Sequence, residues 1–150
     1  MEDYYKVAEI KLVYKPKYPA KSRPVIDSSK KGYEILKSHW DDGLMQFLEQ
    51  FKIILLNNAN RVLGIFEVSL GGINGVMVDQ RVVFAAAIKA NASQMILSHN
   101  HPSGNLQPSS QDRQLTKLLV EGGKILNIKI IDHIIVSVDG YYSFSDEGDL

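Results

Sequence analysis

The segment between residues 98 and 112 of this 150-residue chain gathers side chains that could hold a metal ion. His99 and His101 lie two positions apart, and Asp112 follows near the start of an expected helix. Because side chains alternate along a strand, both imidazoles project to the same side if a strand delivers them. Two histidines and one carboxylate leave a position open for water, which is the ligand pattern of a catalytic zinc. The segment therefore predicts one Zn²⁺ ion bound by His99, His101 and Asp112.

A hydrolytic zinc site also requires a general base, which takes a proton from water and returns it to the leaving group. Zinc lowers the pKa of its bound water to about 7, so this base would work near neutral pH. Glu67 is the predicted base, because it interrupts a mostly apolar face of the strand expected over residues 61–70. Glu9 and Glu49 are the alternative positions for the base.

Ser109 is expected to open the helix that carries Asp112, and its hydroxyl is predicted to stabilise the oxyanion of the reaction. Removing one such donor costs about 2.7–4 kcal/mol of transition-state stabilisation. Ser-x-x-Asp at a helix start is also similar to a capping box, a local device that needs no metal. The two interpretations are compatible, since a capping serine can still face the site.

Composition limits the class of protein. The 17 Lys/Arg balance 17 Asp/Glu, so overall charge gives no reason to expect nucleic-acid binding. Residues 1–37 carry nine Lys/Arg against five Asp/Glu, which is interpreted as a solvated face, with nucleic-acid contact as the weaker alternative. Without cysteine, a metal must be held by nitrogen and oxygen. No apolar run of about 20 residues and no secretory signal pattern is present, so we expect a cytoplasmic protein with no membrane contact.

Hydrophobic periodicity and turn residues predict the elements that must position these side chains. The first half is expected to contain, in order, a strand over 7–14, a Pro-rich loop over 15–24, a helix from a cap at Asp27 or Ser28 to about Trp40, a short helix over 44–49, and a hairpin of strands over 51–56 and 61–70.

The second half of the chain carries the predicted ligands. It is expected to contain a brief strand over 73–78, a helix from a cap at Asp79 to about Ala90, a strand over 94–98 that delivers His99, a loop over 102–108, a helix from Ser109 to about Glu121 that Gly122-Gly123 stops, and strands over 128–138 and 141–144. His133 is expected to be a packed or surface histidine. Helices interleaved with a mixed sheet predict a compact three-layer α/β domain over 1–150, with 1–24 as an N-terminal strand and Pro-rich extension.

The spacing of the site residues resembles a known family. His99-x-His101, then Ser109 and Asp112 with an upstream glutamate, is similar to the JAMM (JAB/MPN-type) metalloprotease motif at every spacing. The string His-Asn-His-Pro-Ser-Gly-Asn, together with Leu-Gly-Ile at 63–65 and Asp-His-Ile-Ile at 132–135, resembles the RadC branch over roughly residues 45–147.

The resemblance implies a cytidine-deaminase-like (JAB/MPN) fold, with a three-layer mixed sheet flanked by helices. It also implies zinc binding by His99, His101 and Asp112, water activation by Glu67 and oxyanion stabilisation by Ser109. RadC proteins typically carry an N-terminal helix-hairpin-helix region. Residues 1–44 contain no such motif, so a short form is expected, and the DNA-repair label often given to the family finds no support in this sequence.

Three functions follow from these observations. The leading one is a zinc-dependent hydrolase, metallopeptidase- or isopeptidase-like, with an unknown peptide or isopeptide substrate. The alternatives are a metal-dependent nuclease, because His-Asn-His superficially resembles nuclease motifs, and a catalytically silent MPN-type binding module. A deaminase is excluded because its Pro-Cys-x-x-Cys motif is absent. The loops over 71–79 and 102–108 are expected to set specificity, and the oligomeric state is left open.

Overall fold

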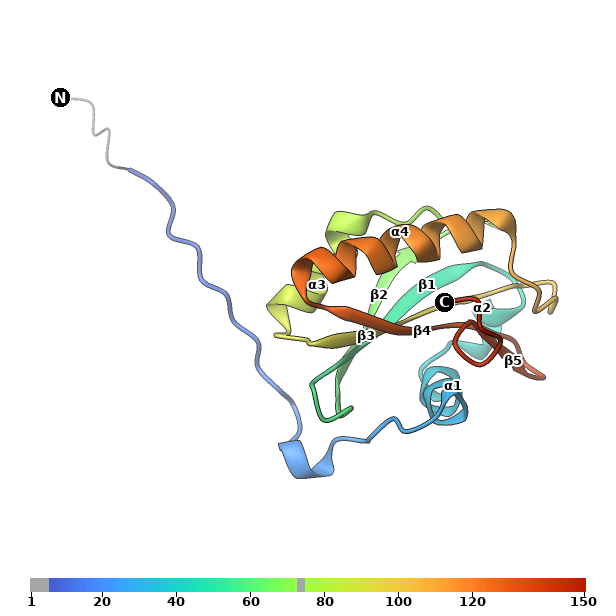
Figure 1. The fold of residues 1–150 in the computed structure, drawn as a ribbon, viewed down its shortest axis with the longest axis horizontal. Helices are drawn as coiled ribbons and strands as arrows, with labels where there is room; N and C mark the ends of the chain where they lie inside the picture. The colour runs from blue at the N-terminus through green and yellow to red at the C-terminus, as the bar shows by residue number, and fades with distance from the viewer. Residues whose placement is uncertain (1–5, 73–74) are drawn as a thin grey trace.

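A single mixed sheet of five strands organises the chain in the computed structural model, which describes residues 6–72 and 75–150 (Figure 1). The strand order is β2-β1-β3-β4-β5. β1 is antiparallel to both β2 and β3, β3 is parallel to β4, and β4 is antiparallel to β5. The strands are β1 (Gln50–Leu56), β2 (Val62–Leu70), β3 (Gln94–Asn100), β4 (Lys129–Val136) and β5 (Tyr141–Ser143).

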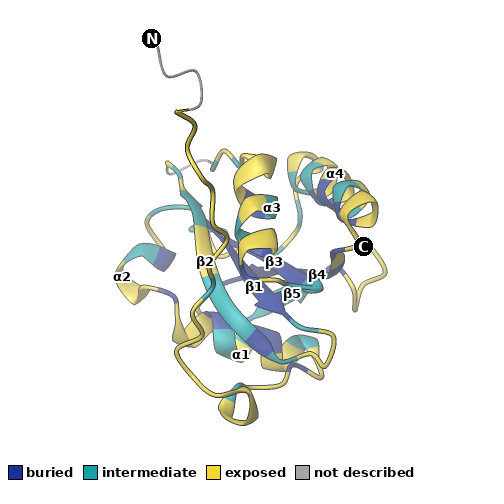
Figure 2. Ribbon diagram, turned by 90° about the vertical axis from the view of Figure 1, so that its left-hand side faces the viewer, coloured by how far each residue is buried: buried dark blue, intermediate teal, exposed yellow. Residues whose placement is uncertain are grey.

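Helices cover both faces of this sheet (Figures 1 and 2). The helices are α1 (Ser29–Ser38), α2 (Asp42–Met45), α3 (Gln80–Lys89) and α4 (Ser110–Leu126), with a short 3-10 turn at Ala20–Ser22. One hydrophobic cluster joins α3 and α4 to their face of the sheet, and a second joins α1 and α2 to the opposite face. The prediction of a three-layer mixed α/β fold is therefore confirmed. None of the helices in the described ranges is long and apolar enough to cross a membrane.

The helix starts agree with the capping residues expected from the sequence. The Ser28 side chain accepts a hydrogen bond from Lys31 N at the start of α1, and that of Asp79 accepts from Arg81 N at the start of α3. Such contacts satisfy backbone donors that have no partner within the helix. α2 instead begins at Asp42 and ends at Met45, earlier than the predicted range of 44–49.

The strand predicted over residues 7–14 is wrong. This segment leads away from the body of the molecule, and Val7 and Ile10 are 84% and 86% exposed (Figure 1). Residue types that favour strands form one only where they pack against a neighbour, so the pattern alone was insufficient here. Tyr14 anchors the end of the segment, because its hydroxyl donates to Leu63 O at 2.5 Å.

α4 continues through Gly122 and Gly123, which the sequence predicts to stop it, and ends at Leu126, where Asn127 follows in the left-handed conformation. The glycines serve close packing instead. A Cβ on Gly123 would lie 2.3 Å from Ile128 O, and one on Gly122 would lie 2.9 Å from the Phe84 ring. Both distances are well inside contact, so α4 can approach its neighbours closely only because these positions lack a side chain.

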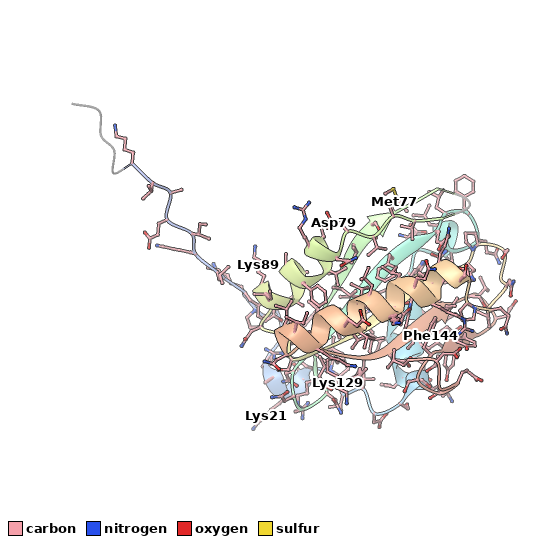
Figure 3. All side chains as sticks on the ribbon, turned by 45° about the horizontal axis from the view of Figure 1, so that its top comes forward. Lys21, Met77, Asp79, Lys89, Lys129 and Phe144 are labelled. Carbon is pink, nitrogen blue, oxygen red and sulfur yellow. The ribbon has the colours of Figure 1, made fainter. Side chains whose placement is uncertain are left out.

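The brief strand predicted over residues 73–78 is also not found in the described part of that range. Residues 73 and 74 lie outside the described residues, and residues 76–78 form no strand. A single bridge joins Gly72 to Gly75. Met77, in the same loop, is 91% exposed (Figure 3).

Candidate metal centre

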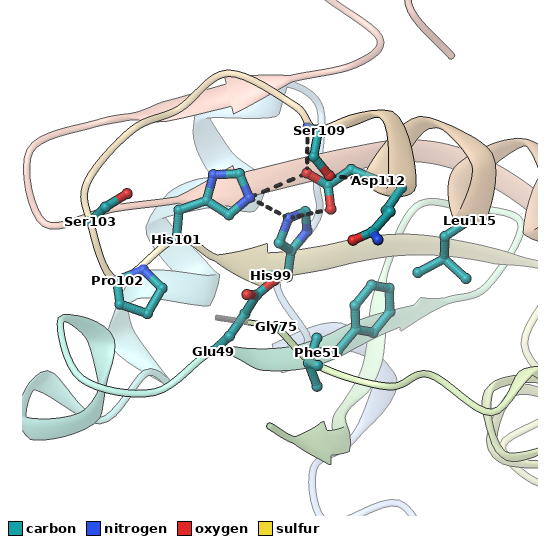
Figure 4. Close-up of a pocket in the computed structure, with 12 residues that line it drawn as sticks. Glu49, Phe51, Gly75, His99, His101, Pro102, Ser103, Ser109, Asp112 and Leu115 are labelled. Atoms are coloured by element: carbon teal, nitrogen blue, oxygen red, sulfur yellow. Dashed lines mark hydrogen bonds and ion pairs between the residues drawn. The ribbon is translucent and has the colours of Figure 1, made fainter. Parts of the chain in front are cut away.

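β3 and the first turn of α4 bring the three predicted ligands together (Figure 4). His99 Nε2 lies 3.2 Å from Asp112 Oδ1, His101 Nε2 lies 3.3 Å from Asp112 Oδ2, and the two Nε2 atoms are 2.9 Å apart. Ligand atoms about 2.0–2.2 Å from one tetrahedral zinc are roughly 3.4 Å from each other. The donor set and its spacing therefore fit a single ion.

Glu49 completes this cluster. One ligand atom from each of Glu49, His99, His101 and Asp112 falls within a group whose members are all within 4.8 Å of one another. β1 runs antiparallel to β3 with Phe51 opposite His99, so the residue two positions before Phe51 shares its face and lies toward His101. Figure 4 shows the Glu49 side chain rising from this position toward the two imidazoles.

Asn100 holds the backbone on both sides of Glu49. Its side chain lies on the face of the sheet opposite His99, is fully buried, and accepts a hydrogen bond from Gln50 N at 2.7 Å. It also donates to Met45 O at 2.7 Å and to Leu48 O at 2.9 Å. The middle residue of the His-Asn-His string therefore fixes the junction of α2 and β1 beside the cluster.

The structure does not bring Glu67, the predicted base, to this cluster. Glu67 lies on β2 opposite Lys52, which neighbours Phe51 along β1 and so points to the other face of the sheet. Its side chain is 45% exposed, and its carboxylate lies 3.9 Å from Lys52 Nζ and accepts a hydrogen bond from Gln50 Nε2 at 3.2 Å. Glu49, one of the alternative positions, lies in the cluster instead. The sequence signal that could have identified Glu49 is strand alternation. Glu49 lies two positions before Phe51, the first residue of the apolar run at 51–56, so both side chains are expected on the same face.

Ser109 and Asp112 form a capping box at the start of α4. Ser109 Oγ accepts from Asp112 N at 3.0 Å, and Ser109 N donates to Asp112 Oδ2 at 2.8 Å. The Ser109 hydroxyl acts here as an acceptor, so its own proton is available to another group in the same cavity. The capping contacts of Asp112 thus coexist with its contacts to His99 and His101.

The electrostatics of the cluster favour an ionised carboxylate. Burial would raise the pKa of Asp112, but the contacts of its carboxylate with the rings of His101 and His99 and the hydrogen bond from Ser109 N hold that pKa well below its usual range. Burial opposes the charged form of His101, yet hydrogen bonds to Asp112 and Asn105 O raise its pKa. For Glu49, burial is the largest effect and raises the pKa of its carboxyl.

A cavity of about 360 Å³ opens over the cluster. Gly75 and Val76 line it from one side, and Pro102 and Ser103 line it from another. These residues belong to the two loops that the sequence assigned to specificity. A substrate that reached the cluster would therefore contact both loops.

The site and the fold agree with a known family. The sequence model of the RadC-like JAB domain matches residues 26–149. The chain belongs to this family.

Relatives of this RadC-like JAB domain are found in several bacteria. The chain is 48% identical over 100 residues to a protein of Flavobacterium johnsoniae, covering 67% of this chain and 44% of the relative. It is 40% identical over 127 residues to a protein of Thermotoga maritima and 38% identical over 128 residues to one of Desulfitobacterium hafniense, covering 83% and 84% of this chain and 54% of each relative. The chain thus spans about half the length of these relatives, and their shared name, UPF0758 protein, states no reaction.

Proposed function

We propose that this RadC-like JAB domain is a zinc-dependent hydrolase that cleaves an amide or isopeptide bond. The observation that carries the proposal is the convergence of His99 Nε2 and His101 Nε2, 2.9 Å apart, on the carboxylate of Asp112. Two ring nitrogens at this distance need a positive charge between them, either a shared proton or a metal ion, and the adjacent Asp112 carboxylate supplies a third ligand atom for a metal ion. Two histidines and a carboxylate, without cysteine, suit zinc.

His99, His101 and Asp112 would hold the ion. A bound zinc supplies Lewis-acid activation of water and of the scissile carbonyl. Glu49, rather than Glu67, is proposed to accept the proton of the attacking water and to return it to the leaving nitrogen. Its position supports this, because it belongs to the cluster and its raised pKa lies nearer to neutrality than that of an exposed glutamate.

Ser109 is proposed to donate its hydroxyl proton to the oxyanion of the tetrahedral intermediate. Its hydroxyl lines the same cavity as Glu49 and the three ligands. The Asp112 N–H already donates to the Ser109 oxygen, which fixes the direction of the hydroxyl relative to α4. Such preorganised donors stabilise developing charge without reorganising during the reaction.

Metal content tests the ion directly. The wild-type protein is expected to retain or take up one zinc per chain in elemental analysis, and His99→Ala is expected to lose it. His39→Ala is the matched control, because His39 is exposed at the end of α1 and outside the cluster. Equal zinc content in the His99→Ala variant and the wild type would contradict the metal site.

A cleavage panel tests the bond. The zinc-loaded protein is incubated with peptide, isopeptide-linked and DNA substrates, and cleavage of a peptide or isopeptide substrate is expected. Loss of that cleavage in the Glu49→Gln variant supports hydrolysis at this site. DNA cleavage alone would contradict the amide assignment, and zinc binding without cleavage of any substrate class would favour a binding module.

A further inference from the structure

His133 is a fully buried histidine beside the cluster of Glu49, His99, His101 and Asp112. It lies on β4, its Nε2 is 2.8 Å from His99 Nδ1, and its Nδ1 is 2.6 Å from Thr116 Oγ1. Phe144 stacks on the ring with centroids 4.7 Å apart, under the N-terminal half of α4 (Figure 3). Both ring nitrogens of His133 are therefore engaged, and each contact needs one proton.

The proton on Thr116 settles the first of these contacts. The Thr116 hydroxyl has a single proton and lies 2.6 Å from Asp112 O, a carbonyl oxygen that can only accept. That proton must be donated to Asp112 O, since two oxygens at this distance would otherwise repel each other. The contact between Thr116 and His133 then needs the proton of His133 Nδ1, so His133 is the donor.

The second contact follows from the first. His133 is fully buried, and the groups in contact with its ring, Thr116, His99 and Phe144, carry no negative charge that would stabilise an imidazolium, so the ring is neutral and carries only the proton at Nδ1. His133 Nε2 therefore accepts, and His99 Nδ1 must donate to it. This leaves the lone pair of His99 Nε2 directed at the cluster.

We propose that His133 is a positioning residue that, as an acceptor for His99 Nδ1–H, fixes the His99 tautomer whose Nε2 can bind the metal. His101 is fixed in the same tautomer by a different partner, because its Nδ1 donates to Asn105 O at 2.6 Å. The acceptor behind a metal-bound histidine is usually a carboxylate, a carbonyl or water. A neutral imidazole adds no negative charge to the site. The effect of His133 on zinc binding rests on the proposed zinc site, whereas the assignment of the His99 and His133 tautomers does not depend on it.

Nuclear magnetic resonance tests the tautomers without any metal. Long-range proton–nitrogen spectra of the ¹⁵N-labelled full chain separate protonated from unprotonated ring nitrogens, and four histidines can each be assigned by one substitution. Protons are expected on Nδ1 of both His99 and His133, and none on His133 Nε2, with and without zinc. A proton on His133 Nε2 in the wild-type protein would overturn the proposal.

Thr116 offers a test that leaves the ligands in place. Thr116→Val removes the acceptor of His133 Nδ1–H, so His133 is expected to move its proton to Nε2 and His99 to lose its free Nε2 lone pair. Loss of the hydrogen-bond partners that orient a metal-binding histidine weakens metal binding about 10–100-fold. Thr116→Ser keeps the hydroxyl and is expected to restore wild-type zinc affinity.

The outcomes separate this proposal from the proposed function. Zinc affinity of Thr116→Val within about threefold of wild type, with the His133 proton still on Nδ1, would overturn the positioning role. A loss of thermal stability with unchanged ring signals would also overturn it, as it would indicate packing alone. If the wild type binds no zinc, the proposed function fails, and the ring spectra of the metal-free protein still decide the tautomers.

Discussion

Glu49, just before β1, and Glu67, on the edge strand β2, lie on opposite faces of the sheet. Glu49 shares the face of Phe51 and His99, whereas Glu67 pairs with Lys52 on the other face. A carboxylate on the wrong face of a strand cannot reach the cluster without breaking the register, since a shift by one residue moves every side chain to the other face. Of these two glutamates, Glu49 is therefore the one that lines the cavity.

Glu49→Gln is expected to lower kcat by about 10²- to 10⁴-fold, the usual contribution of a general base, while zinc content stays at the wild-type value. Glu67→Gln is the matched control. Its ion pair with Lys52 is long, at 3.9 Å, and the Glu67 side chain is 45% exposed, so the loss of this pair should cost less than about 1 kcal/mol of stability and leave kcat unchanged. Steady-state kinetics of the two zinc-loaded variants decide between them, and equal loss of kcat in both would contradict the assignment.

Ser109 can be tested in its two roles separately. Ser109→Ala removes both the cap and the hydroxyl, so it is expected to cost about 1 kcal/mol of stability, whereas Ser109→Gly costs only a few tenths (~0.3 kcal/mol). Both variants lack the oxyanion donor and should lose about 10²- to 10³-fold in kcat. Denaturant unfolding and kinetics measure the two effects. Full activity in Ser109→Gly would limit Ser109 to capping.

At the level of elements, the close packing of α4 depends on its paired glycines. Gly123 leaves no room for a Cβ because Ile128 O is in the way, and a backbone atom there cannot move without disturbing the start of β4. The neighbour of Gly122 is instead the Phe84 ring, which can turn. α4 carries Asp112 at its other end, so the docking of this helix on the sheet sets where the carboxylate lies.

Gly123→Ala is expected to destabilise the protein by about 1–3 kcal/mol, although alanine is the better helix former by about 1 kcal/mol. Gly122→Ala should cost less. Glu121→Ala, at an exposed position of the same helix, is the control for helix propensity. The free energy of unfolding in urea measures all three, and a stabilised Gly123→Ala variant would show that the backbone contact is not limiting.

Local signals were enough to predict the central strands, the caps of α1 and α3, and the proximity of His99, His101 and Asp112. The run at residues 51–56 is mostly apolar because β1 is buried along its whole length. The two histidines project to the same side because β3 extends through Asn100, the residue between them. Two features required tertiary knowledge: which face of the sheet each glutamate occupies, and whether Gly122-Gly123 ends a helix or packs it. The Val7–Tyr14 pattern failed for the same reason, since no packing partner is visible in a local sequence.

In the whole molecule, the candidate site joins parts of the chain that are distant in sequence. Glu49 precedes β1, His99 lies on β3, His101 follows β3 and Asp112 begins α4. An ion bound by His99, His101 and Asp112 would cross-link the middle of the sheet to the helix that covers it. An ion that binds the folded chain and not the unfolded chain must stabilise the fold.

Zinc is expected to raise the thermal midpoint of the full chain. At a free zinc concentration of 100 times Kd the gain is about 2.7 kcal/mol, and a chelator should reverse it. His99→Ala should show no zinc-dependent shift, whereas His39→Ala should shift as the wild type does. A shift of the wild-type size in the His99→Ala variant would place the ion elsewhere.

Anomalous X-ray diffraction from crystals grown with zinc tests whether His99, His101 and Asp112 bind one zinc ion. We expect one anomalous peak that appears above the zinc absorption edge and vanishes below it. That peak should lie about 2.0–2.2 Å from His99 Nε2, His101 Nε2 and an oxygen of Asp112. A zinc-saturated crystal with no peak among these three side chains, or with its peak at another site, would show that they are not the zinc ligands.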